Sequence, residues 1–317
     1  QTVFNVLLLT ANFIYCRQEL NVKFRFDSFR WTFIRQILSF SVWVFLGDIM
    51  FKFYYNTGQF VLGATSGTIE VALFALGVTL MQMYMMFSGG ISGVLLPKIT
   101  SMVAQHKTDK EISDLFIRTG RLQYIVMAVI LVGFVVLGKQ FIQLWAGPDY
   151  VGVYSIALIF FLSTIVPLIQ NTAISILQAR NQQKYRSLML VIVGVVSLVF
   201  QVILSNYYGA VGCAIAVGAA NIIGQGIILN WYYYSRQNLN IIKFWKEIGK
   251  MTIVPASIAV VGYFIINEFT IDSWLKFILA VVCIMVLYIP LVWKFGMNES
   301  ERLLFSRPLQ RIKNKLL

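Results

Sequence analysis

The sequence predicts an all-α polytopic membrane protein with about nine transmembrane helices. Hydrophobic residues make up 58% of the 317 residues, charged residues only 12%, and the mean hydropathy is +0.75. A water-soluble core of this size does not need so much apolar surface. The apolar runs are long enough to cross a bilayer as helices, and they lack the alternation that strands of a membrane barrel require.

The first apolar run, at residues 1–15, is shorter than the others. At 1.5 Å per residue it reaches roughly 22 Å, which is less than the ~30 Å hydrocarbon core of a bilayer. We therefore expect it to be the end of a longer helix, in a chain that lacks the N-terminal spans of the complete protein. The remaining predicted spans cover residues 37–62, 71–96, 122–144, 153–177, 188–206, 210–230, 251–267 and 275–293.

The spans and their connections divide the chain into three predicted regions. Residues 1–35 hold the end of a preceding helix and a cytoplasmic linker. Residues 36–235 form a lobe of six helices, and residues 236–317 add two helices and a basic cytoplasmic tail. Ahead of the span at 122–144, the stretch DKEISDLFIRTGRLQ (109–123) predicts an amphipathic helix that lies at the membrane interface.

The formal net charge is +13, and the basic residues gather in alternate loops. Lys and Arg are frequent in the loops at 98–121 and 178–187 and in the C-terminal tail, whereas the loops at 63–70 and 145–152 contain none. The positive-inside rule then places the basic loops and the C-terminus in the cytoplasm, and the other loops outside. We expect the basic charge to contact anionic membrane lipids, and we expect no nucleic-acid partner.

Two charged residues interrupt the apolar run at 37–62. Asp48 and Lys52 share one helix face with Tyr55 and Gln59. Each charge near mid-membrane costs roughly 2.5 to 3.5 kcal/mol on insertion scales. Either the two charges neutralise each other and hold this helix against a neighbour, or the face lines a hydrated cavity. The continuation of the polar face beyond the two charges favours the cavity.

Polar side chains also recur at helical spacing in later spans. One such stripe by itself is typical of hydrogen bonding between helices. Several stripes in one protein favour a shared polar interior. The candidate substrate-path residues are Asp48, Lys52, Tyr55, Gln59, Asn171, Gln201, Asn221 and Gln225.

No pattern in the sequence indicates catalysis. Cys16, Cys213 and Cys283 are isolated, and His106 is the single histidine, so we expect no metal site and no disulfide. Nucleophile and paired-carboxylate constellations are also missing from the sequence, and no soluble domain extends from either face. We therefore expect a protein that is not an enzyme and holds no cofactor.

Six blocks of sequence, taken in order, resemble one known family. Their order and spacing resemble the polysaccharide-transporter branch of the multidrug/oligosaccharidyl-lipid/polysaccharide exporter superfamily, the Wzx-type O-antigen flippases. In that two-lobed, fourteen-helix architecture, this chain is similar to the sixth to fourteenth helices, and residues 36–235 correspond to a transport lobe. The blocks are NTGQFVLGATSG (56–67), GVLLPKIT (93–100), LFIRTGRLQ (115–123), LWAGPDY (144–150), ILQARNQQKYRS (176–187) and YGAVGCAIA (208–216).

The resemblance implies a flippase of the bacterial cytoplasmic (inner) membrane that serves O-antigen, lipopolysaccharide or capsule biosynthesis. Its substrate would be an undecaprenyl-pyrophosphate-linked oligosaccharide, which moves to the outer leaflet by alternating access. Lys52 would meet the pyrophosphate or an acidic sugar, and Asn and Gln side chains would meet hydroxyls. Asp48 would either hold Lys52 in place or take part in proton or sodium coupling. The implied partners are this lipid-linked oligosaccharide, anionic membrane lipids and other membrane proteins of polysaccharide assembly.

One position departs from the resembling proteins, which often carry Asp where Gly58 stands. Either Asp48 takes over the role of that acid, or a coupling scheme that uses it does not apply here. Two other functions fit parts of the sequence. A multidrug or cation exporter of the same superfamily would carry several cavity acids, whereas Asp48 is matched by Lys52. In a non-transporting membrane subunit of a polysaccharide synthase, the polar stripes would only hold helices together.

Overall fold

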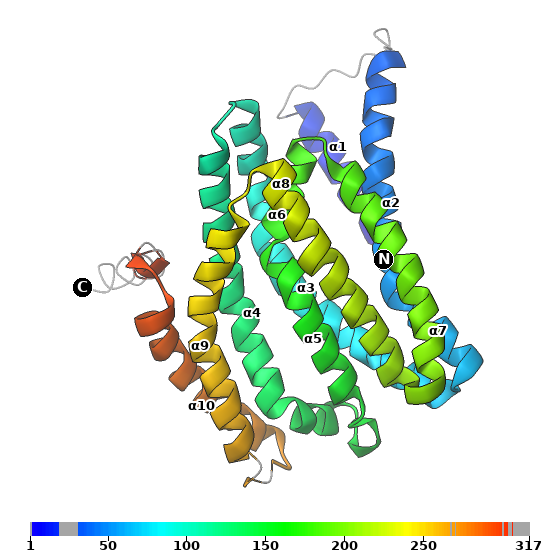
Figure 1. Cartoon of the computed structure of the whole chain (residues 1–317), viewed down its shortest axis with the longest axis vertical. Coiled ribbons are helices and arrows are strands. Elements are labelled where there is room, and N and C mark those ends of the chain that lie inside the picture. The colour runs from blue at the N-terminus through cyan, green and yellow to red at the C-terminus, as the bar shows by residue number, and fades with distance from the viewer. Residues whose placement is uncertain are drawn as a thin grey trace. The chain divides into compact units, whose positions relative to one another are not determined.

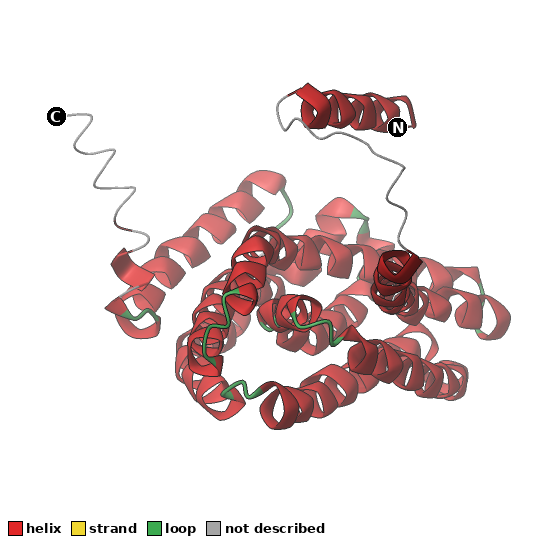
Figure 2. Ribbon diagram, turned by 90° about the horizontal axis from the view of Figure 1, so that it is seen from above, coloured by secondary structure: helices red, strands yellow, loops and turns green. Residues whose placement is uncertain are grey.

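The computed structural model describes residues 2–18, 31–266, 268–269, 271–299, 301–303 and 306. These residues form helices joined by loops, so the all-α prediction is confirmed for the described part of the chain (Figure 2). The chain divides into two compact units, Gln1–Val42 and Trp43–Leu317, and each is described by itself.

The first unit contains helix α1 (Thr2–Gln18) and the beginning of helix α2 (Trp31–Thr65). Helix α1 carries the first predicted apolar run, and its apolar part, Phe4–Tyr15, is shorter than a membrane span. Apolar side chains such as Leu9 are exposed on this helix. Most of the predicted linker that follows lies outside the described residues.

The second unit contains the rest of α2 and all later helices (Figure 1). Two short π-helical segments and one 3-10 turn connect or extend the α-helices. In chain order the elements are α3 (Thr68–Ala104), α4 (Asp109–Trp145), η1 (Pro148–Tyr150), α5 (Val153–Ile169), α6 (Asn171–Ala179), α7 (Gln183–Asn221), η2 (Ile222–Ile228), α8 (Leu229–Gln237), α9 (Ile241–Ile266), α10 (Trp274–Leu291) and η3 (Val292–Gly296).

Within the described residues, six helices are long and apolar enough to cross a membrane. The number is seven if the bent pair α5 and α6 forms one span. The sequence predicts about nine, on the basis of run length alone. The difference arises because α1 is too short and because the runs at 188–206 and 210–230 are counted together as one helical stretch, Gln183–Gln237, although that stretch contains two arms.

That stretch reverses direction at Gly209. The backbone of Gly209 has φ 54° and ψ −134°, a conformation that is not helical and that glycine adopts more readily than other residues. Beyond the turn, the thiol of Cys213 lies 3.8 Å from the carbonyl oxygen of Gln201. A straight helix would separate these two residues by about 18 Å. The two predicted runs are therefore the two arms of a hairpin, as Figure 1 shows for α7.

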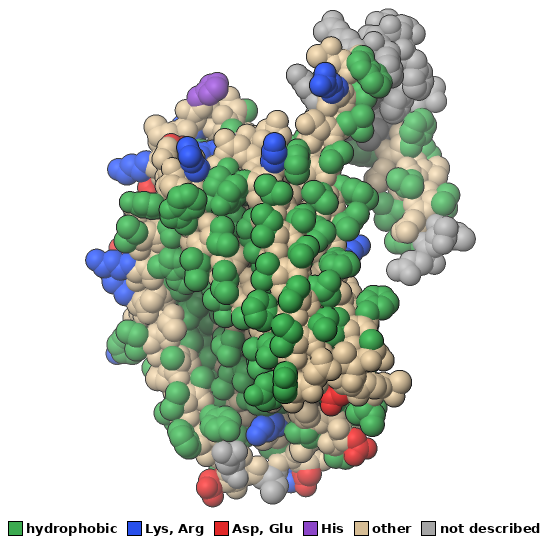
Figure 3. All heavy atoms as spheres, turned by 45° about the vertical axis from the view of Figure 1, so that its right-hand side comes forward, with side chains coloured by type: hydrophobic (Ala, Val, Ile, Leu, Met, Phe, Trp, Pro, Cys, Tyr) green, Lys and Arg blue, Asp and Glu red, His purple; other side chains and the backbone are tan. Residues whose placement is uncertain are grey.

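Loops that the charge pattern assigns to one side of a membrane lie at one end of the second unit. Asp109 accepts hydrogen bonds from Arg180 at 2.7 Å and from Asn238 at 2.8 Å, which joins the predicted cytoplasmic loops at 98–121 and 178–187 to the connection between α8 and α9. At the other end, Glu70 accepts a hydrogen bond of 2.6 Å from the backbone N–H of Ala210. Between the ends, the face in Figure 3 carries a broad hydrophobic surface, which suits contact with lipid.

Helix α5 is apolar on all sides and packs against α3, α4 and α7. Its Phe160 is fully buried, with its ring centroid 5.5 Å from that of Phe74 on α3 and 6.3 Å from that of Tyr55 on α2. A helix that is hydrophobic all round is expected in the interior of a bundle. Helix α5 therefore fixes the positions of the helices that surround the candidate site.

The amphipathic helix predicted at 109–123 is not a separate element. These residues form the first part of α4, which continues without interruption to Trp145. The helix begins with a capping box, in which Thr108 accepts from the N–H of Glu111 and the Glu111 carboxylate accepts from the N–H of Thr108. Its buried face packs against α9, where the rings of Phe116 and Phe244 stack at 4.7 Å. The predicted amphipathic face of this segment therefore packs on α9, and its position relative to a membrane interface stays a prediction.

Candidate functional site

A proline interrupts the helical path between α5 and α6. Pro167 has no N–H for the carbonyl of Ser163, and Nδ2 of Asn221 donates to that carbonyl at 2.8 Å. Helices α5 and α6 are bent by 42° relative to each other. Near the bend, Oγ of Ser88 donates to the carbonyl of Leu168 at 2.6 Å. Side chains thus satisfy backbone groups that the bend would otherwise leave unpaired within apolar surroundings.

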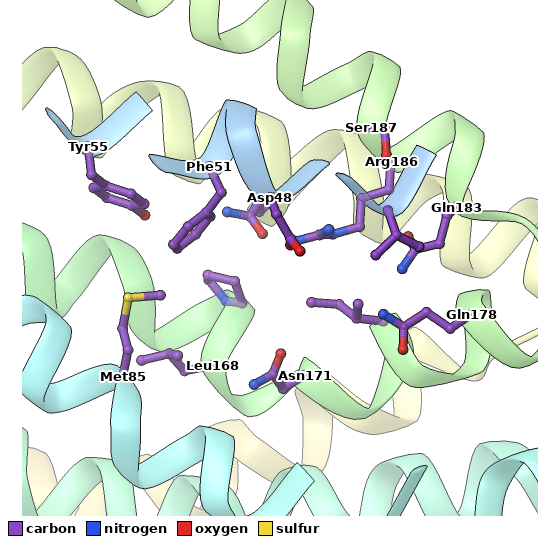
Figure 4. A pocket seen from close by; sticks show the side chains of 14 residues that line it. Asp48, Phe51, Tyr55, Met85, Leu168, Asn171, Gln178, Gln183, Arg186 and Ser187 are labelled. Atoms are coloured by element: carbon purple, nitrogen blue, oxygen red, sulfur yellow. The ribbon is translucent and has the colours of Figure 1, made fainter. Parts of the chain in front are cut away.

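A cavity of about 270 Å³ lies beside this bend (Figure 4). Its walls come from α2, α3, α5, α6, α7 and η2, so segments from Val44 to Gln225 meet there. The volume lies near the lower end of the range for small-molecule sites, roughly 300 to 1,000 Å³. The polar residues of the lining are Asp48, Tyr55, Asn171, Gln178, Gln183, Arg186, Ser187 and Gln225.

Close approach of α2 and α7 brings the charged residues of the lining together. A Cβ atom on Gly47 would lie 3.2 Å from Oγ of Ser187, so a larger residue there would crowd α7. Oγ of Ser187 also donates to the carbonyl of Trp43 at 2.6 Å. Asp48 follows Gly47 and Arg186 precedes Ser187 in the chain, so both charged side chains reach the same cavity.

The side chains of Arg186 and Asp48 point toward each other on one side of the cavity (Figure 4). Asp48 is exposed at the edge of the cavity, whereas Arg186 is half-buried. Their opposite charges attract, but neither side chain forms an ion pair within 4.0 Å in the part of the chain that the structure describes. The cavity therefore contains a balanced pair of charges that remain available to an occupant.

Three buried polar atoms of the lining have no hydrogen-bond partner among the described residues. They are Oη of Tyr55, Oε1 of Gln183 and Nε of Arg186. The side chains of Tyr55 and Gln183 belong to residues that are only 2% and 3% exposed. Buried polar atoms in proteins nearly always have a partner, either in the protein or in a bound molecule. These atoms make the cavity a candidate binding site.

Four of the predicted substrate-path residues meet in this cavity: Asp48, Tyr55, Asn171 and Gln225. They come from three parts of the chain, which the sequence pattern alone does not bring together. Asn171 is the first residue of α6, directly after the bend. Gln225 lies in η2, and its Nε2 donates to Oδ1 of Asn221 at 2.5 Å.

The other four predicted residues do not line this cavity. Lys52 is exposed one turn beyond Asp48, and Gln59 is half-buried further along α2. Nε2 of Gln201 donates to Oγ of Ser197 at 3.1 Å, within the first arm of the α7 hairpin. Nδ2 of Asn221 donates to the Ser163 carbonyl, which Pro167 leaves without a helical donor. Asp48 and Lys52 form no ion pair with each other, so the mutual neutralisation considered for them is not observed. The cation of the cavity is Arg186, where the sequence pointed to Lys52.

The sequence contains a signal for Arg186 that the charge pattern obscures. Gln183 and Arg186 are three residues apart at the start of α7, so they share one helix face. Arg186 also belongs to the basic loop at 178–187, and the positive-inside rule by itself accounts for a basic residue in that loop. The block ILQARNQQKYRS, noted above for its resemblance, contains both residues. A helix start predicted at Gln183 would have placed them together.

Packing explains why glycine stands at position 58. Gly58 is buried, and a Cβ atom added to it would lie 2.4 Å from Cζ of Phe74, which is itself fully buried. An aspartate at this position would require Phe74 to move. Asp48 is therefore the acid of α2 that reaches the cavity in this protein. Among the described residues, no group of three or more His, Cys, Asp or Glu side chains is placed to hold a metal ion.

Comparison with known proteins finds a family match for the first part of the chain. Residues 1–155 match a family described as "Polysaccharide biosynthesis protein". The match includes α1 to α4, and hence the α2 and α3 walls of the cavity. No curated protein and no solved structure matches the chain. Over residues 1–155 the chain is thus similar to polysaccharide biosynthesis proteins, and its long apolar helices are those of a multi-pass membrane protein.

Proposed function

We propose that this protein translocates an undecaprenyl-pyrophosphate-linked oligosaccharide across the bacterial cytoplasmic membrane for surface polysaccharide biosynthesis, by alternating access. The family match over residues 1–155 supports the pathway, and the long apolar helices support the location in a membrane. In this proposal the second unit supplies helices of a two-lobed flippase, as the sequence resemblance implies.

The observation that carries the proposal is the polar cavity among apolar helices. Charged and polar side chains are costly in a membrane interior and commonly mark a pathway for polar substrates there. The cavity is lined by two charges and four amide side chains, and it is not sealed, because Asp48 is exposed. A protein that only held helices together would pair these groups with one another.

Each group of the site has a proposed role. Amide side chains, among them those of Asn171 and Gln225, contact sugar hydroxyls inside the cavity. Lys52, which is exposed one turn beyond Asp48, meets the pyrophosphate outside the cavity. Asp48 faces Arg186 and is the group we assign to proton or sodium coupling. Gln59, Gln201 and Asn221 remain candidates for a longer path that includes surfaces outside this cavity.

The proposed orientation predicts different labelling of two exposed positions. Thr68 lies at the start of α3 near the predicted external loop, and Lys107 lies in a predicted cytoplasmic loop. In intact cells, an impermeant maleimide should label a single cysteine at Thr68 and leave one at Lys107 unlabelled, because the membrane shields the cytoplasmic side. Native cysteines are first replaced by serine. The reverse labelling would show that the protein has the opposite orientation.

Substitution of Lys52 tests its role in transport. Lys52→Gln, introduced into the native gene, should lower surface-polysaccharide display about 10- to 100-fold, which is the usual effect of losing a hydrogen bond to a charged group. The amount of membrane-inserted protein should not change, because Lys52 is exposed and forms no ion pair among the described residues. Lys52→Arg should preserve part of the activity, since it keeps the charge.

The double variant Asp48→Asn with Lys52→Gln separates substrate binding from helix packing. If Lys52 contacts the anionic head of the substrate, the neutral double variant stays inactive although it is inserted. Lys250→Gln on α9 is the matched control, because Lys250 is also exposed and belongs to no part of the cavity. Normal display from the double variant would contradict a substrate-binding role for Lys52.

A further inference from the structure

The cavity offers hydrogen-bonding capacity that the protein does not use. Oη of Tyr55 and Nε of Arg186 are donors, and Oε1 of Gln183 is an acceptor. All three atoms are buried and lack partners in the described part of the protein. Gln183 and Arg186 lie three residues apart on α7 and at the same end of the cavity, whereas Tyr55 lies toward the other end (Figure 4). An occupant that matches the α7 pair carries an acceptor and, close to it, a donor. A secondary amide group has this combination in its C=O and N–H.

The charge of the lining disfavours an anionic occupant. The described lining contains one acid, Asp48, and one base, Arg186, so its formal charges cancel. A pyrophosphate carries more negative charge than one arginine neutralises, and Asp48 would repel it. An uncharged polar molecule keeps the balance of the pair and still gains hydrogen bonds from both side chains.

The remaining surface of the cavity is apolar. Phe51, Met85, Leu168 and Ile174 line it together with the polar groups, and Phe51, Met85 and Leu168 lie opposite or beside the charged pair in Figure 4. An acyl methyl group and the apolar face of a sugar ring both fit such a surface. The volume of about 270 Å³ suits one sugar ring, and the rest of an oligosaccharide would extend out of the cavity.

From these observations we propose that the cavity binds one uncharged, N-acylated sugar unit of the lipid-linked oligosaccharide. Arg186 donates to the acyl carbonyl oxygen, Gln183 accepts from the amide N–H, and Tyr55, toward the other end of the cavity, donates to a ring hydroxyl. Asp48 and the amide side chains contact the ring hydroxyls. The inference rests on the proposed function for the identity of the substrate, and it assigns the sugar and the pyrophosphate to different places.

The test measures binding of four small probes to the purified product of the native gene in nanodiscs. The probes are N-acetylglucosamine, glucose, glucuronate and inorganic pyrophosphate. Saturation-transfer NMR reports the affinities of the three sugars, and a phosphorus NMR titration reports that of pyrophosphate. We expect N-acetylglucosamine to bind about fivefold more tightly than glucose, because each net hydrogen bond contributes about that factor. We expect glucuronate and pyrophosphate to bind more weakly than N-acetylglucosamine.

Two neighbouring tyrosines provide a matched pair of variants. Tyr55→Phe should lower the affinity for N-acetylglucosamine about fivefold and leave thermal stability unchanged, because its hydroxyl has no partner in the described protein. Tyr54→Phe should lower thermal stability and leave the affinity for N-acetylglucosamine unchanged. The hydroxyl of Tyr54 donates to the carbonyl of Val217, and Tyr54 does not line the cavity. Gln183→Leu should behave like Tyr55→Phe. Gln140→Leu, which removes an unpartnered buried oxygen elsewhere, should leave binding unchanged.

Several results would overturn the inference. Equal affinity for glucose and N-acetylglucosamine would show that the cavity does not recognise the acyl group. Stronger binding of glucuronate or pyrophosphate would show that the cavity is an anion site. Absence of binding by any probe at 100 mM would also overturn it. Polysaccharide display distinguishes this failure from failure of the proposed function. If Lys52→Gln loses display but no probe binds, the transport proposal stands and the sugar site does not. If the probe binds but Lys52→Gln and Tyr55→Phe both show normal display, only the sugar site stands.

Discussion

Replacement of Arg121 by methionine is expected to lower the free energy of unfolding by about 3 to 5 kcal/mol. Arg121 extends from α4, and its side chain is 4% exposed. Its Nε and Nη2 donate to the two carboxylate oxygens of Glu301 at 2.6 and 2.9 Å, and Nη1 donates to Glu247 of α9 at 2.7 Å. Without the arginine, the buried carboxylate of Glu301 loses its counter-charge, and the half-buried carboxylate of Glu247 keeps only the more distant Lys250, at 3.8 Å.

The measurement is thermal unfolding in detergent, together with the yield of membrane-inserted protein. Lys243→Met is the control, because Lys243 and Asp114 form an ion pair of 3.1 Å whose side chains are about half exposed. Its loss should cost less than about 1 kcal/mol. Arg121→Met combined with Glu247→Gln and Glu301→Gln should recover much of the stability, since no unpaired charge remains. Unfolding of Arg121→Met at the wild-type temperature would contradict the structural role given to Arg121.

Gly212→Ala is expected to disrupt the hairpin of α7, with a loss of about 3 kcal/mol or more. A Cβ atom at this position would lie 2.2 Å from the carbonyl oxygen of Leu204 and 2.7 Å from its carbonyl carbon. Both are backbone atoms of the opposite arm, so a change of rotamer does not relieve the overlap. Thermal unfolding of the purified protein measures the effect.

Gly249→Ala is the matched control for this substitution. Gly249 also lies within a helix, α9, but a Cβ atom there would meet nothing within 4 Å. The alanine should stabilise that helix by about 0.5 to 1 kcal/mol, because glycine loses more backbone entropy on folding. Equal unfolding temperatures of Gly212→Ala and Gly249→Ala would contradict the close packing of the two hairpin arms at Gly212.

The apolar runs predict most of the helices, but they do not predict how each helix ends or bends. The run at 153–177 reads as one span, whereas Pro167 divides it into α5 and α6. The runs at 188–206 and 210–230 read as two spans, and Gly209 joins them as a hairpin. Residues 109–123 read as an interfacial helix, yet they continue into α4. Hydropathy reports whether a segment is apolar, and it carries no information on the partners of its backbone.

For the candidate site, the sequence identifies polar faces, and packing decides which of them meet. Asp48, Tyr55, Asn171 and Gln225 meet because the bend at Pro167 and the approach of α2 to α7 at Gly47 bring their helices together. Lys52 lies between Asp48 and Tyr55 along α2, but at about 100° per residue it projects to the other side of Asp48 from Phe51 and Tyr55, and it therefore does not line the cavity.

The sequence by itself determined that the described chain is helical, that several segments are apolar enough to cross a membrane, and that its loops alternate between two ends. Each of these properties depends on residues that are close together in the chain. The tertiary structure alone decided that Arg186 opposes Asp48, and that Tyr55 and Gln183 keep unpartnered atoms in the same cavity. These relations join α2 to α7 across more than a hundred residues, and helix periodicity fixes only the face of each helix, not the neighbour it meets.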